Sequence, residues 1–349
     1  MSRLNVPVCL EVRGSIFGRR CREIGIWGLV IVQLSVGAPP VSYYPAVYES
    51  AQDSGRLIVF PLNRSKYFLP VPGLHGGVVY GSDGRTVYVT TAERREIPGG
   101  GGRLGTVAVP GLFKVDLESG HVAAISGSTE FLYILAFAVS QRQDRVVVSG
   151  HRWSPGHDTC GLYMVSVPNG EVDAVFASSN CDKLPYGAIS LAPDGKRAVT
   201  VRGGRLDILD LVSGSDTPWK DTGDRFWRAE WSPDGKWIAA LALTGGARGN
   251  DGGSRTVLLD PSDPARRRDF DGNNDKEAVW SPDSRSLLHA VWSPRPKPSV
   301  ADCLTLETLD IDTGRRQAIE TSRCQLSSNS IGWISSDLLP LGSVAPSRK

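Results

Sequence analysis

Residues 231–240 read Trp-Ser-Pro-Asp-Gly-Lys-Trp-Ile-Ala-Ala, a tight turn that leads into an apolar run. Pro sets φ in the first half of the turn and Gly tolerates a positive φ, so the stretch predicts a β-hairpin. Five related phrases occur elsewhere, beginning at Gly81, Val139, Leu191, Trp280 and Ile334. The six starts are separated by 58, 52, 40, 49 and 54 residues, spacings typical of β-propeller blades.

A second hairpin follows most copies of this phrase. Residues 161–176, for example, alternate apolar and polar side chains on both sides of an Asn169-Gly170 turn. Two hairpins per period supply four strands, the content of one blade. The composition agrees, because 39 Gly and 23 Pro against 2 Met indicate a turn-rich chain rather than a helical bundle. We therefore predict an all-β fold: a six-bladed β-propeller with four-stranded antiparallel blades.

The phrase at Trp231, followed by a strand, an Asp-Leu pair and a Thr/Ser-Gly turn, resembles the WD40-like repeat of TolB-type β-propellers. The resemblance covers residues 55–345. It departs from the pattern at residues 140–144, which lack the Pro and Gly, and at residues 335–337, where the turn is short. Because TolB-type propellers are associated with periplasmic protein interaction, the resemblance implies a non-catalytic protein that binds a protein or peptide. TolB itself is expected to carry an additional α/β domain, for which the 16 residues between Ala38 and Gly55 leave no room.

The two ends of the propeller segment complement each other. Only one hairpin's worth of sequence follows Ile331, and residues 55–71 form a hairpin that precedes the first repeat phrase. We predict that the C-terminal hairpin supplies the two inner strands of the sixth blade and that residues 55–71 supply its two outer strands. Such joining would leave no free sheet edge at the closure. Seven blades, one of them irregular, are the alternative.

The first 38 residues are typical of an export signal. Four arginines between Arg13 and Arg22 precede 15 uncharged residues, 24–38, that end in small side chains before Pro39. A bilayer span needs about 20 residues, so the run favours a signal peptide, with a retained membrane anchor or a buried strand as alternatives. The predicted organisation is a signal peptide or anchor over 1–38, a linker over 39–54, the propeller over 55–345 and a tail over 346–349. We expect a periplasmic or secreted monomer, attached to a membrane only through the N-terminal segment if at all.

Four cysteines outside the leader form two evenly spaced pairs. Cys160 and Cys181 are 21 positions apart, as are Cys303 and Cys324, and each pair brackets a predicted hairpin. Opposed residues of antiparallel strands lie close to disulfide distance, so we predict the bonds Cys160–Cys181 and Cys303–Cys324. A closed loop of this length contributes on the order of 3 kcal/mol. Four reduced core thiols are the alternative, and a zinc site is disfavoured because neither pair has CxxC spacing.

Long Gly- and Pro-rich links join the second and third strands of several blades, at residues 92–110, 151–159, 244–254 and 293–302. If the repeat turns lie on one face, these links gather on the opposite face, where a propeller would present a binding surface. The candidate binding residues on this rim are Arg94, Arg95, Arg152, His157, Asp158, Arg248, Arg295 and Lys297. Flexible surface loops without a ligand are the alternative interpretation.

Catalytic motifs are absent from the sequence. No Gly-x-Ser-x-Gly, His-Glu-x-x-His, P-loop or dinucleotide fingerprint occurs, so we predict no cofactor and no catalytic residue. A formal net charge of +2 gives no electrostatic footprint for nucleic acid. The Asp-rich stretch 269–275 departs from an EF-hand loop, and we predict no metal site there.

A metal-dependent propeller hydrolase of the lactonase type is the alternative function. It would hold a divalent cation in the central channel with carboxylates from several inner strands, for which Glu230 and Glu277 are the main candidates. Trp231, Trp280 and Trp333 stand at strand positions beside the repeat turns. For these three we predict packing between blades rather than ligand stacking.

Overall fold

The computed structural model describes residues 42–50, 54–61, 67–72, 77–98, 104–153, 159–179, 188–219, 223–244, 253–272, 274–293, 303–323 and 330–338. Contacts divide the chain into Met1–Pro40 and Val41–Lys349. All described residues belong to the second unit, and the architecture below is that of this unit alone.

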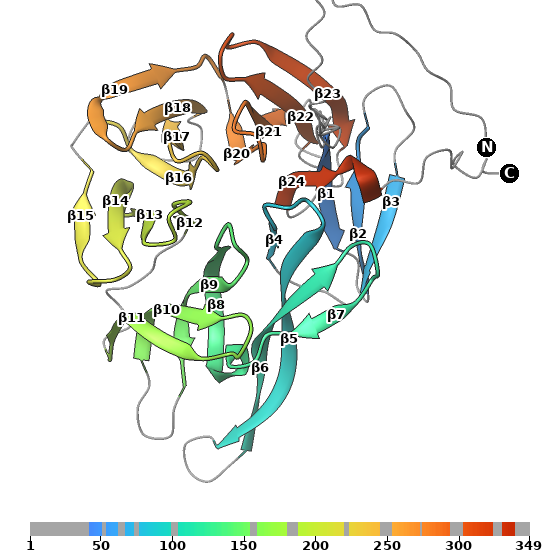
Figure 1. The fold of residues 1–349 in the computed structure, drawn as a ribbon, viewed down its shortest axis with the longest axis vertical. Helices are drawn as coiled ribbons and strands as arrows, with labels where there is room; N and C mark the ends of the chain where they lie inside the picture. The colour runs from blue at the N-terminus through green and yellow to red at the C-terminus, as the bar shows by residue number, and fades with distance from the viewer. Residues whose placement is uncertain are drawn as a thin grey trace, which may run out of the picture. The chain divides into compact units, whose positions relative to one another are not determined.

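Six four-stranded antiparallel sheets make up the described fold, arranged around an axis as the blades of a propeller (Figure 1). Five sheets consist of consecutive strands, so the predicted fold class is confirmed. The first contains β4 (Val78–Tyr80), β5 (Thr86–Pro98), β6 (Leu104–Asp116) and β7 (Val122–Ala124). The second contains β8 (Phe131–Val139), β9 (Arg145–Arg152), β10 (Thr159–Ser166) and β11 (Val172–Ser178), preceded by the 3₁₀ turn η2 (Ser128–Glu130).

The next three sheets repeat this order. The third contains β12 (Ile189–Leu191), β13 (Arg197–Arg202), β14 (Arg205–Asp210) and β15 (Asp216–Pro218). The fourth contains β16 (Phe226–Trp231), β17 (Ile238–Leu243), β18 (Ser254–Asp260) and β19 (Asp263–Asp269). The fifth contains β20 (Asp275–Trp280), β21 (Ser286–Ser293), β22 (Cys303–Asp310) and β23 (Arg316–Arg323).

The sixth sheet closes the ring by joining the two ends of the propeller, but not in the predicted proportions. Its order is β24 (Ser330–Ser335), β1 (Tyr43–Ser50), β2 (Ser54–Val59) and β3 (Tyr67–Pro72). One strand therefore comes from the C-terminal side and three from the N-terminal side. The prediction that both inner strands come from the C-terminal side was wrong, because β1 is the second strand and occupies part of the segment assigned to a linker. The prediction that residues 55–71 supply the two outer strands is confirmed by β2 and β3.

Local chemistry explains this difference. Pro45 removes one backbone donor from β1 and obscures its strand pattern, yet its carbonyl oxygen accepts a hydrogen bond of 2.9 Å from the Phe60 N–H. After β24 the chain forms the 3₁₀ turn η4 (Ser336–Leu338) instead of a hairpin turn. The Asp337 N–H donates to Ser335 Oγ at 3.3 Å, and Arg85 Nη2 lies 2.8 Å from Asp337 Oδ2. The η4 turn thus ends the contribution of the C-terminal segment to the sixth sheet after the single strand β24.

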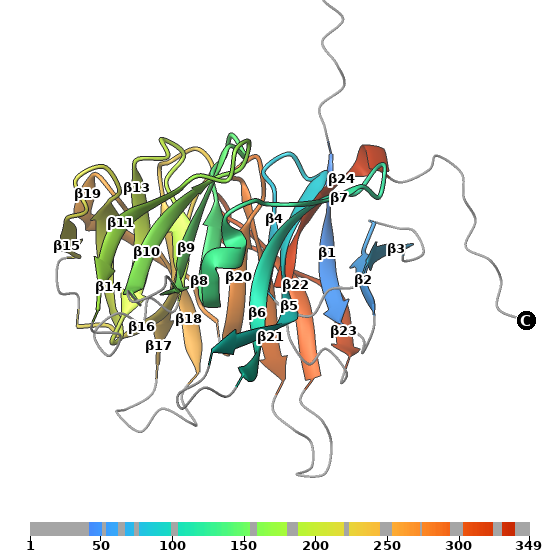
Figure 2. The same ribbon diagram turned by 90° about the horizontal axis from the view of Figure 1, so that it is seen from below.

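The repeat phrase forms the predicted hairpin turn in each of the first five sheets. Gly84, Gly195 and Gly235 adopt φ values of 64°, 65° and 76° as the fourth residue of the hydrogen-bonded turn. Gln143 and Ser284 take up the same conformation at 57° and 60° in the copies that lack Gly. All these turns lie on one face, which we call the turn face, and the inner strands begin at the opposite face, which we call the link face (Figure 2).

Apolar residues between neighbouring sheets form the core. One cluster joins Val199 and Leu206 of the third sheet to Trp231, Ile238 and Val257 of the fourth. The tryptophans add directional contacts: Trp280 Nε1 donates to the Glu230 carbonyl oxygen at 3.1 Å, and Trp333 Nε1 donates to the Val279 carbonyl oxygen at 3.3 Å. Trp231, Trp280 and Trp333 are 8% exposed or less, so the prediction that they pack between blades is confirmed.

The predicted long loop at residues 92–110 is mostly a β-hairpin. Strands β5 and β6 stay paired from Thr86 opposite Asp116 to Pro98 opposite Leu104, and the pair extends away from the ring (Figure 1). The prediction of a loop was wrong because Glu93, Arg94 and Arg95 interrupt the apolar pattern. Pairing along the strand overrides this local polarity.

Candidate binding site

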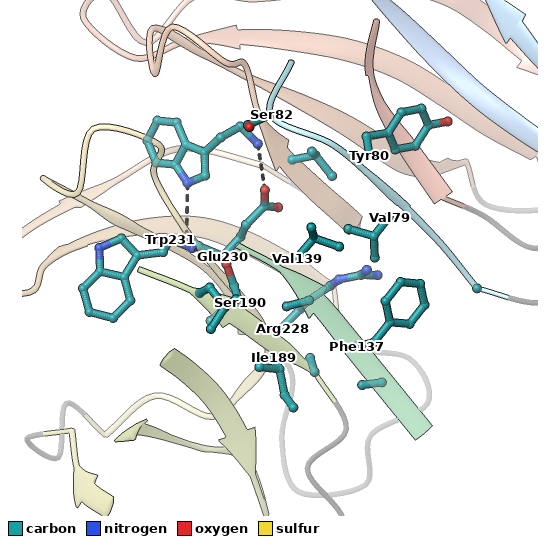
Figure 3. Close-up of a pocket in the computed structure, with 18 of the residues that line it drawn as sticks. Val79, Tyr80, Ser82, Phe137, Val139, Ile189, Ser190, Arg228, Glu230 and Trp231 are labelled. Atoms are coloured by element: carbon teal, nitrogen blue, oxygen red, sulfur yellow. Dashed lines mark hydrogen bonds between the residues drawn. The ribbon is translucent and has the colours of Figure 1, made fainter. Parts of the chain in front are cut away.

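A cavity of about 480 Å³ lies on the axis of the ring. The innermost strands of all six sheets contribute to its wall (Figure 3). The hydrogen-bonded repeat turns begin at Gly81, Ser140, Ala192, Ser232 and Ser281. The residues four positions before them line the cavity as one layer: Gly77, Ala136, Ala188, Arg228 and Glu277. The residues two positions before these turns form a second layer, nearer the turn face: Val79, Ala138, Ser190, Glu230 and Val279. The sixth sheet contributes Ile331 and Trp333 to the lining. The repeat register therefore converts equivalent sequence positions into rings of side chains.

Two large apolar side chains remain exposed in this cavity. Leu135 is 53% exposed and Trp227 is 42% exposed. Each stands where the register of the inner strand shifts against the second strand, between Ile134 and Ala136 in β8 and between Phe226 and Arg228 in β16. Such β-bulges redirect a side chain out of the regular alternation and are common beside functional sites. Exposed apolar groups in a concave, largely apolar cavity are typical of a binding site.

The two sheets β16–β19 and β20–β23 place an ion pair in the wall. Arg228 Nη2 lies 2.8 Å from Glu277 Oε1, and the Glu277 side chain is 5% exposed. Burial raises the pKa of Glu277, although the Arg228 guanidinium opposes the shift. The pair is thus a fixed feature of the wall, in which each charge compensates the other.

Glu230 lies on the same wall as Arg228 (Figure 3). Its Oε1 accepts a hydrogen bond of 3.3 Å from the Trp280 N–H. Desolvation by burial raises the pKa of Glu230 to about 8, with Arg228 opposing the shift and Glu277 adding to it. The Glu230 carboxyl is therefore largely protonated at neutral pH.

Replacing Glu230 by Gln is expected to flatten the pH dependence of stability. Because the pKa of Glu230 is higher in the folded than in the unfolded chain, the folded state binds more protons. The contribution of the protonated Glu230 carboxyl to stability is fully present below about pH 4.5 and is lost as the pH rises through about 8. Above that pH, Glu230→Gln should raise the free energy of unfolding by on the order of 2 kcal/mol, less than the whole shift implies because Glu230 keeps partial exposure.

Urea unfolding of both proteins at acidic, neutral and alkaline pH measures this difference. Glu118→Gln is the control, because the Glu118 side chain is 69% exposed. A constant difference between Glu230→Gln and the unmodified protein at all pH values would contradict the assignment.

The alternative of a channel metal site receives no support from the carboxylate geometry. Glu230 and Glu277 both line the cavity, as predicted, but Glu277 is engaged by Arg228. Within the described part of the chain, no three His, Cys, Asp or Glu side chains are grouped so that they could hold a metal ion.

The predicted rim residues are mostly not placed. Arg94 and Arg95 lie in β5 opposite Ala108 and Val107. Arg152, at the end of β9, forms an ion pair with Glu130 at 2.5 Å. The others, His157, Asp158, Arg248, Arg295 and Lys297, lie outside the described residues, so the rim stays a prediction.

The predicted disulfides are only partly within the described residues. Cys160 is buried, and it lies opposite Ser178 in the β10–β11 pair. Its predicted mate Cys181 lies outside the described residues, as does Cys324. Both pairings therefore stay predictions.

Sequence reasoning missed Leu135, Trp227 and Arg228. Arg228 occupies the same repeat position as Glu277, so aligning the phrases could have revealed it. Leu135 and Trp227 had no such signal, because only the bulges expose them.

Among the described residues, no helix has the length and hydropathy needed to cross a membrane.

Comparisons with known proteins bear on the fold. No protein-family model matches the chain, and no curated protein matches it by sequence. Among solved structures it is similar to TolB from Acinetobacter baumannii, with 14% identity, a TM-score of 0.55 and coverage of 83% of this chain and 66% of that one. This chain thus spans less than two thirds of that TolB.

Two further structures are similar. A putative TolB from Agrobacterium tumefaciens has 13% identity and a TM-score of 0.55, covering 84% of this chain and 99% of that one. Oligogalacturonate lyase from Vibrio parahaemolyticus has 14% identity and a TM-score of 0.50, covering 77% of this chain and 73% of that one. Similarity at these identities concerns the fold rather than the activity. In fold, the chain is a six-bladed β-propeller that is similar to these solved TolB structures.

Proposed function

We propose that the chain is an exported, non-catalytic β-propeller that binds a protein or peptide through its central cavity and the link face around it. The observation that carries the proposal is the pair of exposed apolar side chains, Leu135 and Trp227, in a cavity to which all six sheets contribute. Their exposure has a hydrophobic cost that a bound partner would remove. Tryptophans in such positions are frequent binding hot spots.

Export and the two disulfides belong to the same proposal. The basic and apolar segments within residues 1–38 favour export. The pairing of Leu304 with Arg323 supports the bond Cys303–Cys324, because the next residue outward on each side is a cysteine. Disulfides persist in oxidising compartments, which fits a periplasmic or secreted protein.

Loss of either of the two apolar side chains should weaken binding. In affinity capture from cell-envelope extracts, we expect Trp227→Ala and Leu135→Ala each to weaken retention of a specific partner about tenfold or more. Both side chains are exposed, so folding should be preserved. Val212→Ala is the matched control, since Val212 is 79% exposed and lies in a turn on the turn face.

A further variant tests the rim. Shortening the projecting β5–β6 hairpin would weaken binding if the link face contributes as well. A partner that is retained equally by all variants would contradict the proposal. Metal-dependent hydrolysis of lactones by the unmodified protein and the shortened variant would instead support the enzyme alternative.

A further inference from the structure

The charged groups of the cavity are unevenly matched. Three of its described lining residues carry a carboxyl or guanidinium group: Arg228, Glu230 and Glu277. Arg228 and Glu277 pair with each other at 2.8 Å. Glu230 has a neutral hydrogen-bond donor, the Trp280 N–H, and forms no ion pair with any described residue. The wall therefore contains one carboxyl group without a cation of its own.

The surroundings of Glu230 suit a cationic guest. Its neighbours in the same layer are uncharged, among them Ala138, Ser190 and Val279. Trp227 stands in the same strand, nearer the link face, and its exposed ring can cover an aliphatic stem or stack against a guanidinium group. A guest that enters from the link face would meet Trp227 first and Glu230 deeper inside.

We propose that the cavity receives a Lys or Arg side chain of an extended partner segment, with its cationic group against Glu230. This inference rests on the proposed binding function and specifies the chemistry of the partner. Paired with a cation, Glu230 would be ionised. The hydrogen bond from the cationic group of the guest to the Glu230 carboxylate would then be charge-assisted, in a site of low polarity. Arg228 does not oppose the guest strongly, because Glu277 already compensates its charge.

Proton release is expected to accompany binding. The carboxyl of the empty site is largely protonated at neutral pH because burial raises its pKa to about 8. A cation would favour the ionised form, so the Glu230 proton would pass to the buffer. The other ionisable groups that face the cavity are Tyr80, Arg228 and Glu277, and the last two remain paired with each other.

Two acetylated and amidated pentapeptides test the proposal, one with Arg and one with citrulline between flanking glycines. Citrulline keeps the shape of Arg but not its charge. In titration calorimetry at neutral pH, the protein should bind the Arg peptide about tenfold more tightly, and the heat should vary with the buffer as a proton is released. Glu230→Gln should abolish both the preference and the proton release, whereas Glu118→Gln should retain both.

Equal affinity for the two peptides, no binding of either at millimolar concentration, or an unchanged preference in Glu230→Gln would overturn the inference. Retention of the captured partner by two variants distinguishes a failure of this inference from a failure of the proposed binding function. Retention lost in Trp227→Ala but unchanged in Glu230→Gln would leave the binding site in place and refute the cationic guest. Retention unchanged in Trp227→Ala would refute the binding site itself.

Discussion

Ending the chain before Ser330, so that β24 is removed, is expected to prevent folding of the propeller. β24 pairs with β1 along its whole length, from Tyr43 opposite Ser335 to Tyr48 opposite Ser330. It also buries Ile331, Trp333 and Ile334, which are 4%, 8% and 0% exposed. At about 1.5–3 kcal/mol for each buried apolar side chain, the loss amounts to roughly 5–9 kcal/mol, comparable with the whole stability of a typical domain.

The removal would also uncover a sheet edge. β1 would expose its backbone donors and acceptors where β24 had paired, which favours association with other chains. We therefore expect aggregation and the loss of cooperative thermal unfolding, measured by calorimetry and size-exclusion chromatography. A chain that ends after Leu338 is the control, because it keeps β24 and η4. A truncated protein that stays monomeric and has the same melting temperature as the unmodified protein would show that β24 does not close the ring.

A milder variant tests the same closure without removing a strand. A Cβ atom on Gly332 would lie 2.2 Å from Cδ2 of Tyr80 in β4, far closer than real contacts allow. Gly332→Ala must therefore displace either β24 or the Tyr80 ring, at a cost of about 1–3 kcal/mol. The variant should still fold and unfold cooperatively, with a melting temperature below that of the unmodified protein.

Replacing Asp275 by Asn is expected to cause the second-largest loss of stability. Asp275 is 1% exposed and accepts hydrogen bonds from Nη1 and Nη2 of Arg316, at 3.0 and 2.9 Å. Thr256 Oγ1 of the fourth sheet donates to Asp275 Oδ2 at 2.8 Å. His289 Nδ1 lies 3.3 Å from the same oxygen. The carboxylate thus connects two neighbouring sheets.

Without the carboxylate, Arg316 loses its principal partner inside the protein. Removing one member of a buried ion pair typically costs about 3–5 kcal/mol. Because Glu307 lies 3.6 Å from Arg316 and retains part of the compensation, we expect about 2–4 kcal/mol for Asp275→Asn. Urea unfolding measures this loss. A cost below about 1 kcal/mol would contradict the assigned role.

A double-mutant cycle and a pH series serve as controls. Asp275→Leu combined with Arg316→Met removes both charges and should cost less than the sum of the two single changes. Burial by itself would raise the pKa of Asp275, but hydrogen bonds from His289 and Arg316 outweigh it and hold the pKa well below its usual value. The stabilisation is therefore present above about pH 4 and is lost as the pH falls further, a loss that Asp275→Asn should not show.

The sequence alone predicted the repeated architecture. Six turn phrases with a suitable period indicated six blades, because Pro, Gly and alternating side chains act through local backbone geometry. The same local signals placed Trp231, Trp280 and Trp333 between blades. They also placed Glu230 and Glu277 on inner strands, and both residues line the cavity.

The tertiary structure decided how the parts meet. The division of the sixth sheet into one strand and three depends on β24 pairing with β1, residues nearly 300 positions apart that leave no joint pattern in the sequence. The exposure of Leu135 and Trp227 arises from bulges, and the pairing of Asp275 with Arg316 spans 41 residues. Periodicity reports which residues share a strand face, whereas these features depend on register and on contacts between sheets, which only the closed ring determines.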